Sequence, residues 1–68
     1  MKKGIYQHFK GQRYEVLDVA KHSETMEEFV VYKTLYGDFD TWIRPKSMFE
    51  EVVEKEGQLI PRFTYVGE

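Results

Sequence analysis

The sequence predicts an all-β protein, a small SH3-like barrel of five to six short antiparallel strands with a short helical turn near residues 46–50. Three observations support this fold class. Runs of β-branched and aromatic residues alternate with short turn-forming segments along the chain. Hydrophobic residues make up 41% and aromatic residues 16% of the composition, which suits a compact interior. The 68 residues allow one modest core, so we expect a single compact domain over residues 1–68.

The amino-terminal segment predicts one strand and one turn. Residues 4–9 read Gly-Ile-Tyr-Gln-His-Phe, a run that suits a pleated surface. Residues 10–12 should break this strand with a tight turn, because Gly11 can take a positive φ.

A long second strand is predicted over residues 13–22, and its apolar side chains change phase. Tyr14 and Val16 share one face of an extended chain. Leu17 and Val19 share the other face. A bulge or bend near Leu17 would reconcile the two pairs.

The middle of the chain predicts a loop, a strand, a turn and a further strand. Residues 23–27 are polar and acidic, and their hydroxyl groups can bond neighbouring backbone groups, which is typical of a loop. Residues 29–35 carry β-branched and aromatic side chains on both faces and predict a central strand. A Gly-Asp pair marks a turn over residues 36–40. The next strand covers residues 41–44 and ends at Pro45, which has no backbone N–H.

The segment 46–56 has two interpretations, because its apolar residues fall at helical spacing while two adjacent valines also suit a strand. We favour a short helical turn after Pro45 and then a strand from about residue 50. Residues 55–57 (Lys-Glu-Gly) predict a hairpin turn into a last strand over residues 58–66. Pro61 places that last strand at an edge or a bulge.

Composition argues against several classes of function. The chain has no cysteine, so it has neither disulfides nor a thiolate metal site. No apolar stretch approaches the roughly 20 residues that span a bilayer, and no signal-peptide core follows the amino terminus. The net charge of −2 argues against non-specific phosphate binding. We therefore expect a cytoplasmic protein of bacterial type with no membrane partner and no cofactor, since the chain also lacks a phosphate-cradling glycine loop and a dinucleotide fingerprint.

Several motifs occur in order along the chain. They are Gly-Ile-Tyr-Gln-His-Phe-Lys-Gly at 4–11, Tyr-Glu-Val at 14–16, His-Ser-Glu-Thr at 22–25, Val-Val-Tyr at 30–32, Leu-Tyr-Gly-Asp at 35–38 and Trp-Ile-Arg-Pro at 42–45, with Met48 and Phe49. Together they resemble the domain of unknown function 1653 family of small bacterial proteins over almost the whole chain. The resemblance implies a compact β fold with a strand-turn-strand pattern over residues 50–63. It implies no activity, because that family has none established.

The aromatic side chains can either pack in the core or stack on a ligand. We expect four of them to pack in the core: Phe9, Tyr14, Phe29 and Phe49. We expect another four to be the exceptions, on one face that a ligand can reach: Tyr6, Tyr32, Tyr36 and Trp42.

Arg44 is the charged residue most suggestive of binding. On a strand it projects from the same face as Trp42, so a ring and a guanidinium could hold one ligand together. A structural salt bridge from Arg44 to Asp38 or Asp40 is the alternative.

The histidines have a functional and a structural interpretation. His8 and His22 could bind a metal or act as a general base, but neither has a second ligand at a suitable spacing, so we predict no metal site. His8 is expected to anchor its turn or line a shallow pocket. Residues 23–25 (Ser-Glu-Thr) follow His22 and are expected to cap a loop rather than to catalyse.

The leading functional hypothesis is a non-enzymatic binding module for a small ligand, a peptide or a nucleic-acid segment. Its candidate binding residues are Tyr6, His8, Tyr32, Tyr36, Trp42 and Arg44. One alternative is a structural protein whose edge strand or aromatic patch forms a homodimer or docks a partner chain. A weaker alternative is an enzyme that uses His8 or His22 with a carboxylate.

Overall fold

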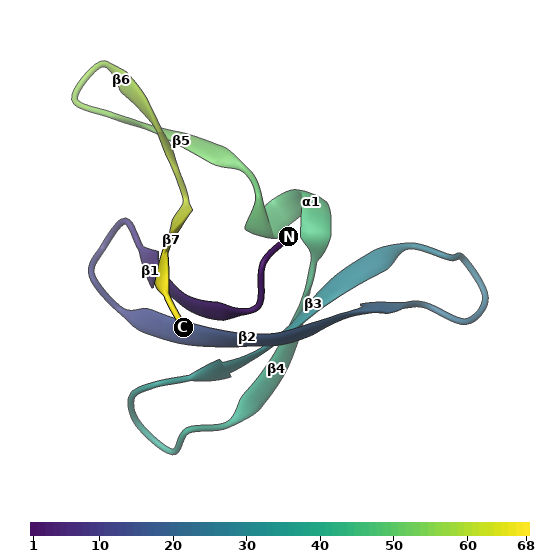
Figure 1. Ribbon diagram of the computed structural model, residues 1–68. Coiled ribbons are helices and arrows are strands. Elements are labelled where there is room, and N and C mark those ends of the chain that lie inside the picture. Colours follow the sequence, from purple (N-terminus) through teal and green to yellow (C-terminus); the bar gives the residue numbers. More distant parts are fainter.

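Seven strands and one short helix make up the protein, as described by a computed structural model of residues 1–68 (Figure 1). In chain order they are β1 (Gly4–His8), β2 (Arg13–Lys21), β3 (Glu28–Thr34), β4 (Thr41–Pro45), α1 (Lys46–Phe49), β5 (Val52–Lys55), β6 (Gln58–Pro61) and β7 (Phe63–Gly67). The all-β prediction is confirmed. No helix is long enough to cross a bilayer, since α1 has only four residues.

The strands form two separate sheets. Five antiparallel strands pair in the order β4-β3-β2-β1-β7, and β5 pairs with β6 in a hairpin that projects away from this sheet (Figure 1). The two edge strands, β4 and β7, do not pair with each other, so hydrogen bonds do not close the sheet into a barrel. The sheet therefore keeps two free edges.

The predicted last strand over residues 58–66 is in fact two strands, which is why there are seven rather than five or six. The break falls at Arg62. Pro61 ends the pairing of β6 with β5, because proline has no N–H to continue a ladder. Phe63 then begins β7 and pairs with His8 of β1.

The predicted bulge in β2 is confirmed at Leu17. Val16 lies opposite Tyr32 and Val19 lies opposite Val30, with the register shift falling between Val16 and Asp18. One extra residue therefore turns Val16 and Val19 to the same face of the sheet. A bulge also bends its strand and increases the local twist. We call the side of the sheet that carries Val16 and Val19 the inner face.

The chain after β4 forms a helical turn and then a strand, which is the interpretation favoured for residues 46–56. The predicted helical turn is α1, and the strand after it begins at Val52 rather than at residue 50. Glu56 and Gly57 form the predicted hairpin turn with φ values of 53° and 79°. Two consecutive positive φ values are typical of a type I′ turn, which matches the twist of the flanking strands.

The core lies between the inner face and α1. Its six buried side chains are Tyr6, Val16, Val30, Tyr32, Phe49 and Phe63. Phe49 projects from α1 and stacks on Phe63 with ring centroids 4.0 Å apart and planes 2° from parallel. The expectation for Phe49 is thus confirmed.

The assignment of the other aromatic residues needs correction. Tyr6 and Tyr32 were expected outside the core but are only 8% and 5% exposed. Phe9 and Phe29 were expected in the core but are half-buried. The reason is register: Tyr6 and Tyr32 occupy inner-face positions of β1 and β3, where α1 covers them.

Candidate ligand-binding pocket

A pocket of about 340 Å³ lies at the end of the inner face that α1 does not cover, beside the turn between β3 and β4. We call it the aromatic–arginine pocket. Its lining residues are Tyr14, Tyr32, Thr34, Tyr36, Gly37, Asp38, Asp40, Trp42 and Arg44. Its volume is within the range of small-ligand sites, near the lower limit.

Strand pairing explains why these residues meet. Tyr32 lies directly opposite Trp42, and Val30 lies directly opposite Arg44. Residues opposite each other in an antiparallel pair project from the same face. Because Tyr32 and Val30 are buried on the inner face, Trp42 and Arg44 must lie beside the core, as predicted for residues that share one face of β4.

Three tyrosines form the floor and one wall of the pocket. The ring of Tyr14 meets those of Tyr32 and Tyr36 edge-to-face, with centroids 5.5 and 5.7 Å apart. The hydroxyls of Tyr14 and Tyr36 share a hydrogen bond of 3.1 Å. Burial, followed by this hydrogen bond, raises the pKa of Tyr14 to about 12. Tyr14 is therefore neutral at physiological pH and presents no negative charge to a ligand.

Arg44 spans the boundary between the pocket and the core. Its guanidinium carbon lies 5.9 Å from the ring centre of Tyr32 and 5.6 Å from that of Phe63, within cation–π range. No carboxylate approaches it within 4 Å, so the predicted salt bridge to Asp38 or Asp40 is wrong. The direction of β4 accounts for this, because Arg44 lies four residues from Asp40, or about 13 Å along an extended strand.

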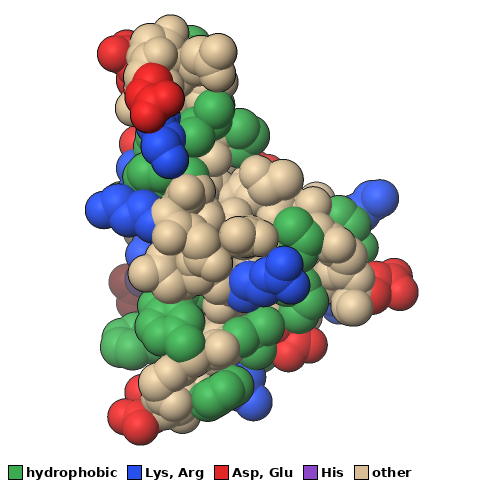
Figure 2. Space-filling model, turned by 90° about the vertical axis from the view of Figure 1, so that its left-hand side faces the viewer, with side chains coloured by type: hydrophobic (Ala, Val, Ile, Leu, Met, Phe, Trp, Pro, Cys, Tyr) green, Lys and Arg blue, Asp and Glu red, His purple; other side chains and the backbone are tan.

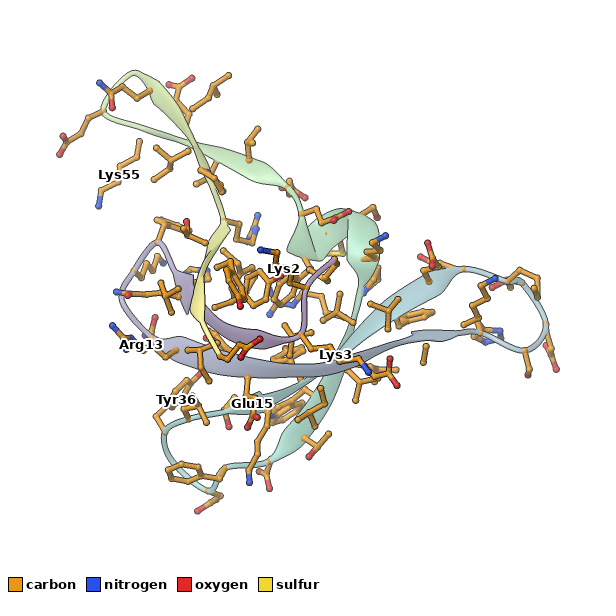
Figure 3. All side chains as sticks on the ribbon, viewed as in Figure 1. Lys2, Lys3, Arg13, Glu15, Tyr36 and Lys55 are labelled. Carbon is orange, nitrogen blue, oxygen red and sulfur yellow. The ribbon has the colours of Figure 1, made fainter.

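The open wall of the pocket is aromatic. Trp42 and Tyr36 are 52% and 46% exposed. Figure 2 shows hydrophobic side chains gathered at the lower end of the molecule, where the turn between β3 and β4 lies, with an acidic side chain at the tip. In Figure 3, Tyr36 lies just below Arg13, and the Arg13 carbonyl accepts a hydrogen bond from the backbone N–H of Leu35. Arg13 itself does not line the pocket.

Tyr6, one of the six predicted binding residues, lies apart from the aromatic–arginine pocket. Its hydroxyl donates a hydrogen bond of 2.7 Å to the Lys2 carbonyl, and burial raises its pKa. Its ring meets Phe49 and Tyr65 edge-to-face. The structure thus uses Tyr6 for packing.

His8 also lies outside the pocket. Its Nδ1 accepts a hydrogen bond of 3.1 Å from the backbone N–H of Lys10, which confirms that it anchors the turn after β1. Its ring contacts Phe9 and Phe63 at centroid distances of 4.5 and 5.0 Å. Burial lowers the pKa of His8, and the nearby cation of Arg62 lowers it further. The remaining four predicted residues, Tyr32, Tyr36, Trp42 and Arg44, do meet in one pocket.

Two residues that sequence reasoning placed elsewhere, or did not single out, shape the pocket. Tyr14 was assigned to packing, yet it joins the core to the pocket floor. Phe63 was not considered, yet its ring supports the Arg44 guanidinium. The sequence signal for Tyr14 is its spacing of two residues from Val16, which places both side chains on one face of β2. Nothing local in the sequence pointed to Phe63.

The second histidine has a structural role in its loop. His22 Nδ1 accepts hydrogen bonds from the backbone N–H groups of Glu24 and Thr25, at 3.2 and 3.3 Å. Thr25 Oγ1 accepts another from the N–H of Glu27. The loop-capping interpretation is therefore confirmed. No group of three or more His, Cys, Asp or Glu side chains is arranged to hold a metal ion.

Comparison with known proteins gives two likenesses. A family described as "Protein of unknown function (DUF1653)" matches residues 4–65. A crystal structure of a DUF1653 protein from Bordetella bronchiseptica is 36% identical in sequence and superposes with a TM-score of 0.88, over 98% of this chain and 88% of that chain. No curated protein matches the sequence. Both likenesses agree with the motifs noted in the sequence, and neither carries an activity.

Proposed function

The chain belongs to the DUF1653 family of proteins of unknown function, and on this premise we propose that it is a non-enzymatic binding module. Its aromatic–arginine pocket holds a small ligand that combines a planar ring with one anionic group. The observation that carries the proposal is Arg44, a half-buried cation with no acidic partner, placed beside exposed aromatic rings in one pocket.

Arg44 supplies the anion-binding part of the proposal. A guanidinium has five N–H donors, and Arg44 donates none of them within the protein. The rings of Tyr32 and Phe63 hold the guanidinium by cation–π contact, which uses none of these donors. A carboxylate or phosphate oxygen can therefore accept two parallel hydrogen bonds, the geometry that arginine favours.

Trp42 and Tyr36 supply the part that recognises a ring. Both are about half exposed and line the pocket across from its buried floor. Stacking of a planar group on such side chains contributes about 1–3 kcal/mol per ring. The Tyr14 hydroxyl, which its raised pKa keeps neutral, and the Tyr36 hydroxyl bonded to it add donors and acceptors to the pocket.

The charges around the pocket favour a single anionic group over a polyanion. Asp38 and Asp40 also line the pocket, and neither forms a salt bridge. Two carboxylates against one guanidinium repel a nucleic-acid backbone, and the net charge of −2 adds to this repulsion. Among small ligands, peptides and nucleic-acid segments, the pocket best fits a nucleoside monophosphate or an acidic aromatic group of a peptide.

Fluorescence titration tests the proposal, because Trp42 is the only tryptophan and lies in the pocket wall. The probes are matched pairs that differ in one anion: adenosine monophosphate with adenosine, and N-acetylphenylalanine with its amide. We expect the anionic member of at least one pair to bind about tenfold more tightly, as for a charge-assisted hydrogen bond. Amide chemical-shift changes should centre on β4 and the turn before it.

Two arginine variants separate a specific contact from general electrostatics. Arg44→Gln should remove the preference for the anionic probe, while Arg13→Gln, which deletes the same charge from the neighbouring end of β2, should keep it. If neither pair of probes perturbs Trp42 or the pocket amides, or if Arg13→Gln is as damaging as Arg44→Gln, the proposal is wrong.

A further inference from the structure

A free sheet edge borders the aromatic–arginine pocket. β4 is the last strand of the five-stranded sheet and pairs only with β3 (Figure 1). Its two central apolar side chains are open to solvent, with Trp42 52% and Ile43 64% exposed. Edge strands of soluble proteins are ordinarily protected by charges, bulges or a covering segment. In β4 such protection comes only from Arg44 on the inner face and from the terminal Pro45, and its pairing with β3 has no bulge.

The hydrogen-bond pattern shows which backbone groups β4 offers at this edge. The Thr34 N–H donates to the Asp40 carbonyl at 3.1 Å, which makes these opposed residues a hydrogen-bonded pair. Such pairs alternate along an antiparallel ladder, so Trp42 and Arg44 also direct their backbone groups toward β3. Thr41, Ile43 and Pro45 therefore direct theirs outward.

The outward groups are complementary to a second copy of themselves. If two β4 strands run antiparallel with Ile43 opposite the partner's Ile43, each Ile43 N–H reaches the other Ile43 carbonyl. Each Thr41 N–H then reaches the partner's Pro45 carbonyl. Because proline has no N–H, the Thr41 carbonyl of each copy has no partner. The other outward groups form four hydrogen bonds, two between the Ile43 residues and two from Thr41 to the partner's Pro45.

The side chains are complementary in the same register. Trp42 lies opposite the partner's Arg44 on the inner face, in a pair without backbone bonds where side chains approach most closely. Because each guanidinium already lies against Tyr32 and Phe63 of its own copy, the aliphatic stem of Arg44 is the part that faces the partner's indole ring. On the outer face the Ile43 pair extends an apolar row, because Val31 lies opposite Ile43 within each copy.

We infer that the protein self-associates through β4, forming a two-fold symmetric dimer in which two five-stranded sheets become one continuous sheet. The inference does not depend on the proposed ligand. A five-residue strand buries little surface, so the dimer is weak, with a dissociation constant of roughly micromolar or higher.

The other unpaired strand edges of the protein are less suited to binding a second copy. At the opposite sheet edge, Tyr65 of β7 is covered by the Lys2 ammonium group, which lies 5.2 Å from the ring centre. Leu59, on the projecting hairpin, is more exposed than Ile43, at 73%. Its strand β6 belongs to the separate two-stranded sheet, so a change at Leu59 alters an exposed apolar residue without touching β4. Leu59 is therefore a matched control site.

Sedimentation velocity over a concentration series tests the dimer. Wild-type protein should shift from monomer to dimer as concentration rises, and Trp42 emission should change on dilution over the same range. Ile43→Lys places two ammonium groups opposite each other and should weaken association by about tenfold or more. Leu59→Lys makes the same chemical change on the hairpin and should associate like the wild type.

A charge-swap experiment distinguishes this interface from a folding defect. Ile43→Lys and Ile43→Glu should each remain monomeric alone, yet form a heterodimer when mixed, because only a symmetric contact brings position 43 against itself. Wild-type protein that stays monomeric at every concentration overturns the inference. So does a dimer that survives Ile43→Lys or is lost in Leu59→Lys.

Discussion

His8 illustrates, at the scale of single residues, how a side chain with chemical potential can serve the backbone instead. Its Nδ1 accepts the Lys10 N–H, so in the neutral ring the proton must lie on Nε2. Protonation of Nδ1 would remove this acceptor. The turn after β1 therefore depends on a neutral imidazole, and burial and the cation of Arg62 favour that state by lowering the pKa of His8.

The lowered pKa predicts an acid-dependent loss of stability. The folded state prefers neutral His8, so this contribution is complete above the unfolded-state pKa of 6.5 and is lost as the pH falls through the lower folded-state pKa. Urea unfolding measured between about pH 7 and pH 5 should show a declining midpoint for the wild type. In His8→Asn, whose amide oxygen can accept the Lys10 N–H but does not titrate, the decline should be shallower. Equal slopes for both proteins would contradict this account.

Trp42 and Arg44 show the opposite case, in which side chains remain available for binding. Their spacing on β4 predicts that they share a face, and the register places that face over the core. Their availability was not predictable from spacing. It arises because the acids closest in sequence lie at the far end of β4, while the rings of Tyr32 and Phe63 hold the Arg44 guanidinium.

At the scale of elements, the β5–β6 hairpin differs from the rest of the structure. It projects from the sheet and is joined to it mainly at its base (Figure 1). There Arg62 Nη2 donates to Glu51 Oε1 at 2.9 Å, the Arg62 N–H donates to the Glu51 carbonyl, and the Phe9 N–H donates to the Arg62 carbonyl. With little apolar burial of its own, the hairpin should open more readily than the sheet.

The turn of this hairpin contains a residue in an unfavourable backbone conformation. Glu56 adopts a φ of 53°, which is unfavourable for most residues other than Gly, Asn and Asp. Glu56→Asn creates the Asn-Gly pair preferred in type I′ turns and should stabilise the hairpin by about 0.5–1 kcal/mol. Amide hydrogen exchange of Val53 and Ile60, which lie opposite each other, should slow accordingly.

Gly57 provides the control for this turn. Its φ is 79°, and a Cβ there would meet no atom within 4 Å, so Gly57→Ala introduces backbone strain without a clash. Exchange of the same amides should become faster in Gly57→Ala, by about 1 kcal/mol in opening free energy. Unchanged exchange in both variants would show that the turn does not limit hairpin stability.

At the scale of the whole molecule, a very small core must hold the sheet and helix together. Only six side chains are buried, and four of them are aromatic. Phe49 is the one that α1 contributes, and it touches Tyr6, Tyr32 and Phe63 from three different strands. The helix therefore acts as the second layer against which the inner face packs.

Truncation of Phe49 should consequently unfold much of the protein. Phe49→Ala removes a fully buried ring and should lower the free energy of unfolding by about 3–5 kcal/mol. A protein of this length has roughly 3–10 kcal/mol in total. Far-UV circular dichroism and urea unfolding measure the loss.

The neighbouring Met48 is a suitable control for this truncation, because it lies in the same helical turn but is 49% exposed. Met48→Ala should change the free energy of unfolding by about 0.5 kcal/mol or less. If both variants lost equal stability, burial of the Phe49 ring would not be the cause of the loss.

Much of the fold and part of the site could be predicted from the sequence, because they depend on neighbours along the chain. The phase change within β2 implies the bulge at Leu17, and Glu56-Gly57 implies the hairpin turn. Pro45 implies the end of β4 and the start of a helical turn. Alternation along β4 likewise implies that Trp42 and Arg44 share a face. Each of these follows from backbone geometry over a few residues.

Only the tertiary structure decided which aromatic residues form the core and which remain open. Burial of Tyr6 and Tyr32 depends on the strands beside them and on α1, which follows β4 in the chain and covers the inner face with Phe49. Support of Arg44 by Phe63 joins residues on β4 and β7, the two edges of the sheet. Local pattern assigns a side chain to a face of its own strand. What lies over that face is set by contacts between segments far apart in sequence, and in this protein those contacts separate the packed rings from the open pocket.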